Sequence, residues 1–168
     1  IGCAEGYYAA GLARRMPTAR VLAFDTNVRA QETCRALAEK NGVGERVIVK
    51  PEFAHEDFAP LAGTETLIVC DIEGAEEQLL DPQKAPALRA LDIVVEVHDC
   101  LKRGLSDELA RRFAATHDMA RIDDDGQRRL ENAPPWFTAL QHLDQLLAVW
   151  EWRTGPTPWL ILRARARS

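Results

Sequence analysis

Short apolar runs alternate along the chain with segments in which apolar residues recur every three or four positions. The runs predict β-strands over Val21–Asp25, Arg46–Lys50, Thr66–Asp71, Asp92–His98, His117–Asp123 and Trp159–Arg163. The helical spacing predicts helices over Glu5–Met16, Asn27–Lys40, Ala75–Leu80, from Ser106 onward and over Leu140–Trp152, with a weak helix in 51–63. This alternation favours an α/β fold with a largely parallel sheet.

Two of the predicted helices have clear start signals. Asn27 and Ser106 each stand where a side-chain oxygen can cap the first turn of a helix. The residues expected to face the core are Val28, Cys34, Leu37 and Ala38 in the first of these helices, and Leu109, Phe113 and Ala114 in the second.

The composition is that of one globular domain spanning residues 1–168. The chain has 168 residues, of which 46% are apolar and 28% charged, and a net charge of −5. An acidic chain makes binding to nucleic acid unlikely, because phosphate recognition usually requires a basic excess. No apolar run approaches the ~20 residues of a membrane span, and no signal peptide is visible. We therefore expect a cytoplasmic protein with reduced cysteines, and we expect a segment upstream of Ile1, where no Met stands.

A glycine loop opens the chain, at Gly2 and Gly6. The loop lacks the Gly-x-Gly-x-x-Gly spacing of dinucleotide-binding proteins, and Leu12 stands where a P-loop requires Lys. What remains is Gly-x-x-x-Gly before a helix, followed by Asp25 at the end of the next strand. Such glycines allow close approach of a ligand, and such a carboxylate can accept both ribose hydroxyls. The pattern favours a nucleoside ligand, and the alternative is a tight turn with a helix-capping acid.

The segment Gly2-Cys3-Ala4-Glu5-Gly6-Tyr7-Tyr8 together with Asp25 resembles the first two motifs of class I S-adenosylmethionine-dependent methyltransferases. The resemblance implies a Rossmann-like methyltransferase sandwich, with a mostly parallel central sheet, helices on both faces and a first strand truncated at the N-terminus. It implies S-adenosyl-L-methionine as the cofactor. The cofactor-binding residues that we expect from these motifs are Gly2, Cys3, Ala4, Glu5, Gly6, Asp25, Thr26 and Asn27.

Adenine is expected near the end of the third strand in this arrangement. Glu52 and Phe53 are the candidates for its edge and its face, with Glu56 or Asp57 as alternatives. Solvated loop acids are the competing interpretation.

Two further motifs resemble the FkbM-type methyltransferases. They are Asp71-Ile72-Glu73-Gly74-Ala75-Glu76 and, some twenty residues later, Val94-Val95-Glu96-Val97-His98-Asp99. That family is associated with O-methylation of small molecules and sugars. The resemblance implies methyl transfer to a small-molecule hydroxyl, with the substrate itself left open.

Asp71, Glu73 and His98 are the expected catalytic residues. The ligand crevice of an open parallel sheet lies at the C-terminal ends of its strands, where these residues would meet Asp25. Asp71 also counts among the expected cofactor-binding residues. His98 has the pKa range of a base that could deprotonate a hydroxyl, and the alternative is a strand-capping His that bonds a neighbouring carbonyl. These acids, with Asp99, could hold Mg²⁺ or Ca²⁺, but no tight ligand spacing supports a metal and none is expected.

Two alternatives remain for the function. The chain could be a non-catalytic binding or interaction domain of the same fold, or, less in keeping with its net charge, an RNA methyltransferase. The four Trp residues all lie in the last 33 positions. This Trp-rich part could serve for core and edge packing or as a homodimer surface, or residues 124–138 could form an acceptor lid with Trp136 and Phe137 against the substrate.

Overall fold

The computed structural model describes residues 1–123, 130–150 and 154–165. The strands are β1 (Val21–Phe24), β2 (Val47–Lys50), β3 (Leu67–Cys70), β4 (Asp92–Glu96), β5 (His117–Ile122) and β6 (Trp159–Ala164). The α-helices are α1 (Tyr7–Arg15), α2 (Val28–Lys40), α3 (Glu76–Leu79), α4 (Leu105–Phe113), α5 (Pro135–Thr138) and α6 (His142–Ala148). Short 3-10 helices, η1 (Gly44–Arg46), η2 (His55–Leu61) and η3 (Pro86–Ala90), connect them.

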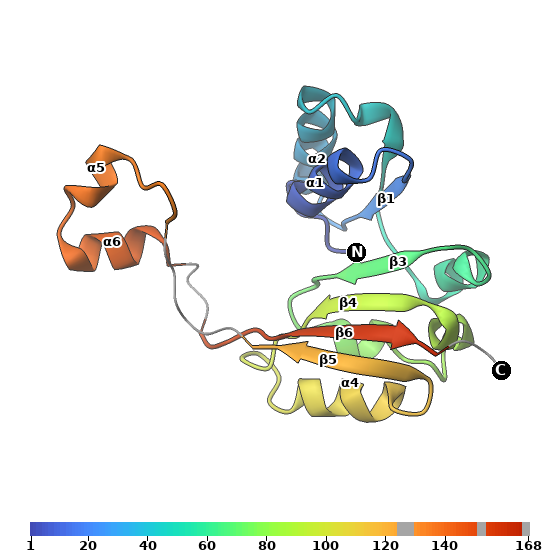
Figure 1. Ribbon diagram of the computed structural model, residues 1–168. Coiled ribbons are helices and arrows are strands. Elements are labelled where there is room, and N and C mark those ends of the chain that lie inside the picture. The colour runs from blue at the N-terminus through green and yellow to red at the C-terminus, as the bar shows by residue number, and fades with distance from the viewer. Residues whose placement is uncertain (124–129, 151–153, 166–168) are drawn as a thin grey trace.

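The strands form a parallel pair, β1 and β2, and a four-stranded sheet in the order β3-β4-β6-β5. The N-terminal residues lie between these two sheets (Figure 1). Ile1 N donates to Val69 O at 2.6 Å and Ile1 O accepts from Asp71 N at 3.1 Å, which is the hydrogen-bond pattern of a parallel strand. On the other side, Gly2 N donates to Phe24 O at 2.9 Å. Ile1 and Gly2 thus join the two sheets into one layer.

One strand runs against the others in the four-stranded sheet. β3 pairs with β4 in parallel, whereas β6 is antiparallel to both β4 and β5. Since β6 is reversed against both neighbours, β5 has the same direction as β4. The expectation of a mostly parallel α/β sheet with surrounding helices is confirmed.

Each half of the molecule has its own apolar core. The smaller core is built from small side chains, among them Ala13 of α1, Cys34 of α2 and Ala23 of β1. The larger core includes Ile93 and Val95 of β4 with side chains of β3, β6 and α4. Small residues let α1 and α2 pack closely against β1 and β2.

The predicted helix starts and core faces are correct in part. Asn27 caps α2, accepting hydrogen bonds at its side-chain oxygen from Arg29 N and Ala30 N. The capping role expected of Ser106 is wrong: α4 begins at Leu105, and Ser106 is buried in its first turn. Val28 is 65% exposed, at the first position of its helix.

The remaining expectations about helices concern their ends. Ala114 is exposed and follows the last residue of α4, so it does not face the core. The helix predicted over 140–152 is shorter, since α6 covers His142–Ala148, and the predicted positions 151 and 152 lie outside the described residues. The predicted strand over 92–98 ends at Glu96, so that His98 lies in the following loop.

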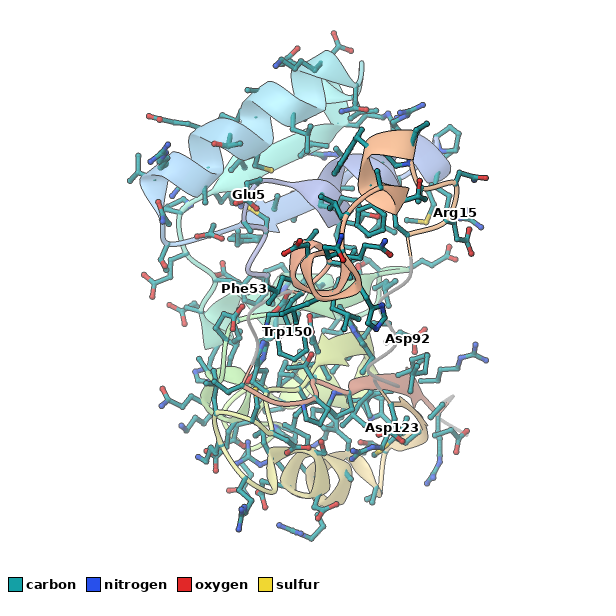
Figure 2. All side chains as sticks on the ribbon, turned by 90° about the vertical axis from the view of Figure 1, so that its left-hand side faces the viewer. Glu5, Arg15, Phe53, Asp92, Asp123 and Trp150 are labelled. Atoms are coloured by element: carbon teal, nitrogen blue, oxygen red, sulfur yellow. The ribbon has the colours of Figure 1, made fainter. Side chains whose placement is uncertain are left out.

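Helices α5 and α6 project away from the two sheets (Figure 1) and lie in front of them in the view turned by 90° (Figure 2). Among the described residues, no helix is long and apolar enough to cross a membrane.

Candidate cofactor and acceptor site

The glycine loop folds tightly against the end of β3. Gly2 has φ +72°, and a Cβ atom at this position would lie 1.7 Å from the carbonyl oxygen of Asp71. Ala4 also has a positive φ, of 43°. Only a residue without a side chain fits position 2, because both the backbone angle and the space exclude a Cβ.

Asp25 directly follows β1 and binds the glycine loop through its carboxylate. Its Oδ2 accepts a hydrogen bond from Ala4 N at 2.9 Å, and its Oδ1 accepts one from Asn27 N at 2.8 Å. Each carboxylate oxygen has two lone pairs, so both oxygens keep acceptor capacity toward a ligand. The two hydrogen bonds fix the carboxylate at the C-terminal end of β1.

A cavity of about 650 Å³ lies at the C-terminal ends of β1, β2 and β3. This volume is within the usual range for sites that bind small molecules and cofactors. The predicted residues that line it are Gly2, Ala4, Asp25, Thr26, Glu52, Phe53, Asp71 and Glu73. The structure therefore brings these eight residues from four chain segments to one cavity.

Phe53 gives the cavity an aromatic wall. Its ring packs edge-on against Phe24 and Phe58, with centroids 4.8 Å and 4.7 Å apart. Because Phe58 is fully buried, this contact anchors Phe53 to the larger core. In Figure 2, Phe53 lies between the two-stranded sheet and the four-stranded sheet. Glu56, one of the alternatives for adenine, also lines the cavity, whereas Asp57 accepts a hydrogen bond from Ala54 N at 2.8 Å.

Four other predicted residues lie in the same loops without lining the cavity. Gly6 is buried at the start of α1, where a Cβ would lie 2.7 Å from the sulfur of Cys34. Cys3 packs against the smaller core, Glu5 is exposed, and Asn27 caps α2. These residues shape the loop around the cavity.

Behind Asp71 and Glu73 lies the imidazole of His98, which is 1% exposed. Its Nδ1 lies 2.7 Å from Glu76 Oε1, and Glu76 is fully buried. Its Nε2 lies 3.2 Å from Glu73 Oε2 and 3.6 Å from Asp71 Oδ1. Glu96 is hydrogen-bonded to Asp71, and Thr157 Oγ1 donates to Glu96 at 2.6 Å. Three carboxylates thus face one imidazole, and a fourth, that of Glu96, reaches the cluster through Asp71.

Burial and mutual repulsion shift the pKa values of this cluster. Burial, followed by the neighbouring Glu96, raises the pKa of Asp71 to about 6. The hydrogen bond to Glu76 raises the pKa of His98 against the opposing effect of burial. Burial favours the neutral form of Glu76, yet the hydrogen bond from His98 and backbone N–H groups lowers its pKa overall. The cluster therefore attracts positive charge.

Two functional candidates of this cluster were not expected from the sequence. Glu76 and Glu96 both belong to the motifs that point to the site. The sequence offered one signal for them, namely their closeness to expected site residues. Glu96 lies two residues before His98, and Glu76 lies five residues after Asp71. Asp99, weighed as a further ligand, turns away, since it accepts a hydrogen bond from Ser106 N at 2.9 Å and binds the Ser106 hydroxyl.

The described residues of the Trp-rich C-terminal part do not line this cavity. Trp136 is 65% exposed and Phe137 is buried on α5, and neither is among the cavity-lining residues. Residues 124–129 of the lid expected over 124–138 lie outside the described residues. Trp150, which is labelled in Figure 2, is 49% exposed.

Comparison with solved structures identifies the fold as the Rossmann-like fold of class I methyltransferases. A putative O-methyltransferase from Klebsiella pneumoniae matches with a TM-score of 0.61 and 14% identity, over 99% of this chain and 71% of that one. The O-methyltransferase from Bacillus cereus in complex with SAH matches with a TM-score of 0.56 and 14% identity, over 97% and 72%. Precorrin 8W decarboxylase from Methanobacterium thermoautotrophicum matches with a TM-score of 0.60 and 17% identity, over 96% and 78%. A scan against protein-family models and a search of curated proteins found no match.

Proposed function

We propose that this protein is an S-adenosylmethionine-dependent methyltransferase that methylates a hydroxyl group of a small molecule. The observation that carries the proposal is the cavity in which a glycine loop and the Asp25 carboxylate meet beside Phe53. In this proposal Asp25 binds the ribose hydroxyls, Phe53 contacts the adenine ring, and the glycine loop lies against the methionine part. The similar protein from Bacillus cereus, crystallised with SAH, supports the choice of cofactor.

The cluster of Asp71, Glu73 and His98 can take part in the methyl-transfer step by accepting the proton of the hydroxyl. The acceptor oxygen attacks the methyl carbon of the sulfonium, the carbon–sulfur bond breaks, and its electron pair stays on sulfur, which leaves neutral S-adenosylhomocysteine. The acceptor loses its proton to the group formed by Asp71, Glu73 and His98. Asp71 and Glu73 line the cavity, so they can reach the acceptor, and His98 stands directly behind them. Positioning in line with the methyl group supplies the remainder of the catalysis.

The acceptor class follows from the FkbM-like motifs at 71–76 and 94–99, whose acidic and His side chains make up the cluster. The net charge of −5 further favours a small molecule over a nucleic acid. We infer a cytoplasmic location from the cysteines, whose thiols are all free.

We also propose a homodimer through α5 and α6. This segment projects from the sheets (Figure 1) and exposes a group of large apolar side chains, namely Trp136, Leu143, Leu146, Leu147 and Trp150. Exposed apolar groups of this kind are typical of interaction surfaces. Sedimentation equilibrium tests it: the wild type should be dimeric and Leu146→Glu monomeric, whereas a monomeric wild type would exclude the dimer.

Calorimetric titration with S-adenosylhomocysteine tests the cofactor. We expect micromolar binding by the wild type and roughly 5- to 150-fold weaker binding by Asp25→Ala, which corresponds to a loss of about 1–3 kcal/mol from the charged hydrogen bonds. Glu65→Ala removes an exposed acid next to β3 and should bind like the wild type.

The result also separates the proposal from its alternative. An affinity unaffected by Asp25→Ala would remove the ribose-binding role of Asp25. The absence of any binding by the wild type would exclude the methyltransferase and leave a non-catalytic interaction domain.

A further inference from the structure

The buried Nε2 atom of His98 has no hydrogen-bond partner in the part of the chain that the structure describes. The Nδ1 atom of the same ring lies 2.7 Å from Glu76 Oε1, and Nε2 lies 3.2 Å from Glu73 Oε2 and 3.6 Å from Asp71 Oδ1. When the single ring proton is on Nδ1, the lone pair of Nε2 faces these two oxygens. Neither Nε2 nor Asp71 Oδ1 forms a hydrogen bond with any of the described residues. Buried polar atoms are almost always paired, and a group of acceptors that face one another repel. A positive charge at this place, from a proton on Nε2 or from a bound cation, completes the arrangement.

A second buried His in the same protein shows the contrast. His117 is also 1% exposed, yet both of its ring nitrogens have partners, Thr116 Oγ1 and Leu91 O, each at 2.9 Å. His117 therefore serves the packing of β5. His98 differs in that one nitrogen is held by a carboxylate while the other faces the cavity-lining acids.

We infer that Asp71, Glu73 and His98 bind a divalent transition-metal cation such as Mn²⁺ or Zn²⁺. One donor atom from each residue lies within 4.8 Å of the other two. Donors bound at about 2.1 Å stand roughly 3.0 Å apart in octahedral and 3.4 Å apart in tetrahedral geometry. The spacings of 3.2 Å and 3.6 Å from Nε2 to Glu73 and Asp71 come close to these values.

The donor types select the class of metal. One imidazole nitrogen with two carboxylate oxygens favours Mn²⁺ or Zn²⁺ over Mg²⁺ and Ca²⁺, which prefer oxygen ligands alone. The buried Glu76 also has the position that a carboxylate takes behind a metal-bound His. There it holds the proton on Nδ1, orients the ring and makes Nε2 a better donor.

The backbone supports this position of Glu73. Its φ is +52°, in a region that a residue with a side chain seldom adopts, and the following Gly74 has φ +99°. The side chain of Glu73 is 76% exposed, and its carboxylate nevertheless lies 3.2 Å from the buried His98. The turn after β3 thus directs an otherwise free carboxylate back toward the imidazole.

A cation at this place would adjoin the cavity through Asp71 and Glu73. It could take the acceptor hydroxyl as a further ligand, lower the pKa of that hydroxyl and orient its oxygen toward the methyl group. The proton would then pass to a carboxylate oxygen of Asp71 or Glu73 that does not bind the cation, because both ring nitrogens of His98 would be occupied. This role in the reaction rests on the proposed function, whereas the binding of the cation does not.

Electron paramagnetic resonance of the full chain with Mn²⁺ tests the site without cofactor or turnover. Binding removes the signal of free aqueous Mn²⁺, and a bound imidazole adds a coupling to ¹⁴N in the spin-echo spectrum. We expect saturable binding of one Mn²⁺ per chain with ¹⁴N coupling, at least tenfold weaker binding in Glu73→Gln, and loss of the coupling in His98→Asn. The exposed Glu73 can be replaced without harm to the fold, so its variant remains informative if His98→Asn unfolds. Glu65→Gln removes the same charge near the other end of β3 and should bind like the wild type.

Three results would overturn the inference. They are no binding up to millimolar Mn²⁺, equal affinity of Glu73→Gln and the wild type, and bound Mn²⁺ without ¹⁴N coupling. A failure of the proposed function gives a different result from a failure of the metal site. In that case the protein would bind Mn²⁺ but would not bind S-adenosylhomocysteine. Binding of S-adenosylhomocysteine without Mn²⁺ would instead leave the function and exclude the metal.

Discussion

Replacement of Gly2 by Ala should disrupt the junction between the two sheets. The new Cβ would lie 1.7 Å from the Asp71 carbonyl oxygen, and it needs at least 3.0 Å, so the two backbones must separate by more than 1 Å. The same shift strains the hydrogen bonds from Gly2 N to Phe24 O and from Asp71 N to Ile1 O. These bonds are among those by which the N-terminal residues connect β1 to β3.

The magnitude follows from three contributions. Ala in a left-handed conformation costs about 1–2 kcal/mol. The two strained hydrogen bonds contribute about 1 kcal/mol each. Forcing an extra methyl group into a packed site adds about 1–3 kcal/mol. We therefore expect Gly2→Ala to lower the free energy of unfolding by roughly 4 kcal/mol or more, which is a large part of the ~5–15 kcal/mol of a typical domain.

Gly42→Ala is the matched control. Gly42 has a similar φ of +67°, but no atom of the described residues lies within 4 Å of the place that a Cβ would take. This variant should lose only the conformational contribution of about 1–2 kcal/mol. Urea unfolding followed by circular dichroism gives both values. Equal losses in the two variants would refute the close contact between Gly2 and Asp71.

Three further predictions concern the wall of the cavity, the thiols and α4. Phe53→Leu should weaken binding of S-adenosylhomocysteine about fivefold, because an aromatic face is worth about 1 kcal/mol or more to a base; unchanged calorimetric affinity would exclude the contact. Burial raises the pKa of the Cys70 thiol to about 12, so Ellman's reagent should modify this thiol at pH 8 only after unfolding. Because the thiol of the unfolded chain ionises first, the free energy of unfolding should fall as pH rises from about 9 toward 12. Rapid modification of the native thiol would contradict its burial. Ser106→Ala should cost about 1 kcal/mol of unfolding free energy through the lost hydrogen bond to Asp99, and an unchanged urea midpoint would argue against that bond.

Local patterns in the sequence predicted most of the elements and the position of the cavity. The apolar runs indicated the strands, and the acids that follow β1 and β3 lie at one edge because parallel strands end there. Gly2 was identified from its motif, and its backbone angle and its contact with Asp71 explain why glycine is needed.

The features that could not be predicted depend on contacts between distant segments. The reversed direction of β6 leaves no mark in its apolar pattern. Ser106 resembles a capping residue, yet in the first turn of α4 it donates its own N–H to the carboxylate of Asp99, seven positions earlier. The surroundings of His98 also depend on distant residues. Glu73, on the turn after β3, and Glu76, at the start of α3, both lie more than twenty positions earlier in the chain.

A crystal structure of the chain grown with S-adenosylhomocysteine tests the central claim most directly. We expect electron density in the cavity at the ends of β1, β2 and β3, with the ribose hydroxyls on Asp25, the adenine against Phe53 and the sulfur toward Asp71. Density at another place on the protein, or an empty cavity at saturating ligand, would contradict it.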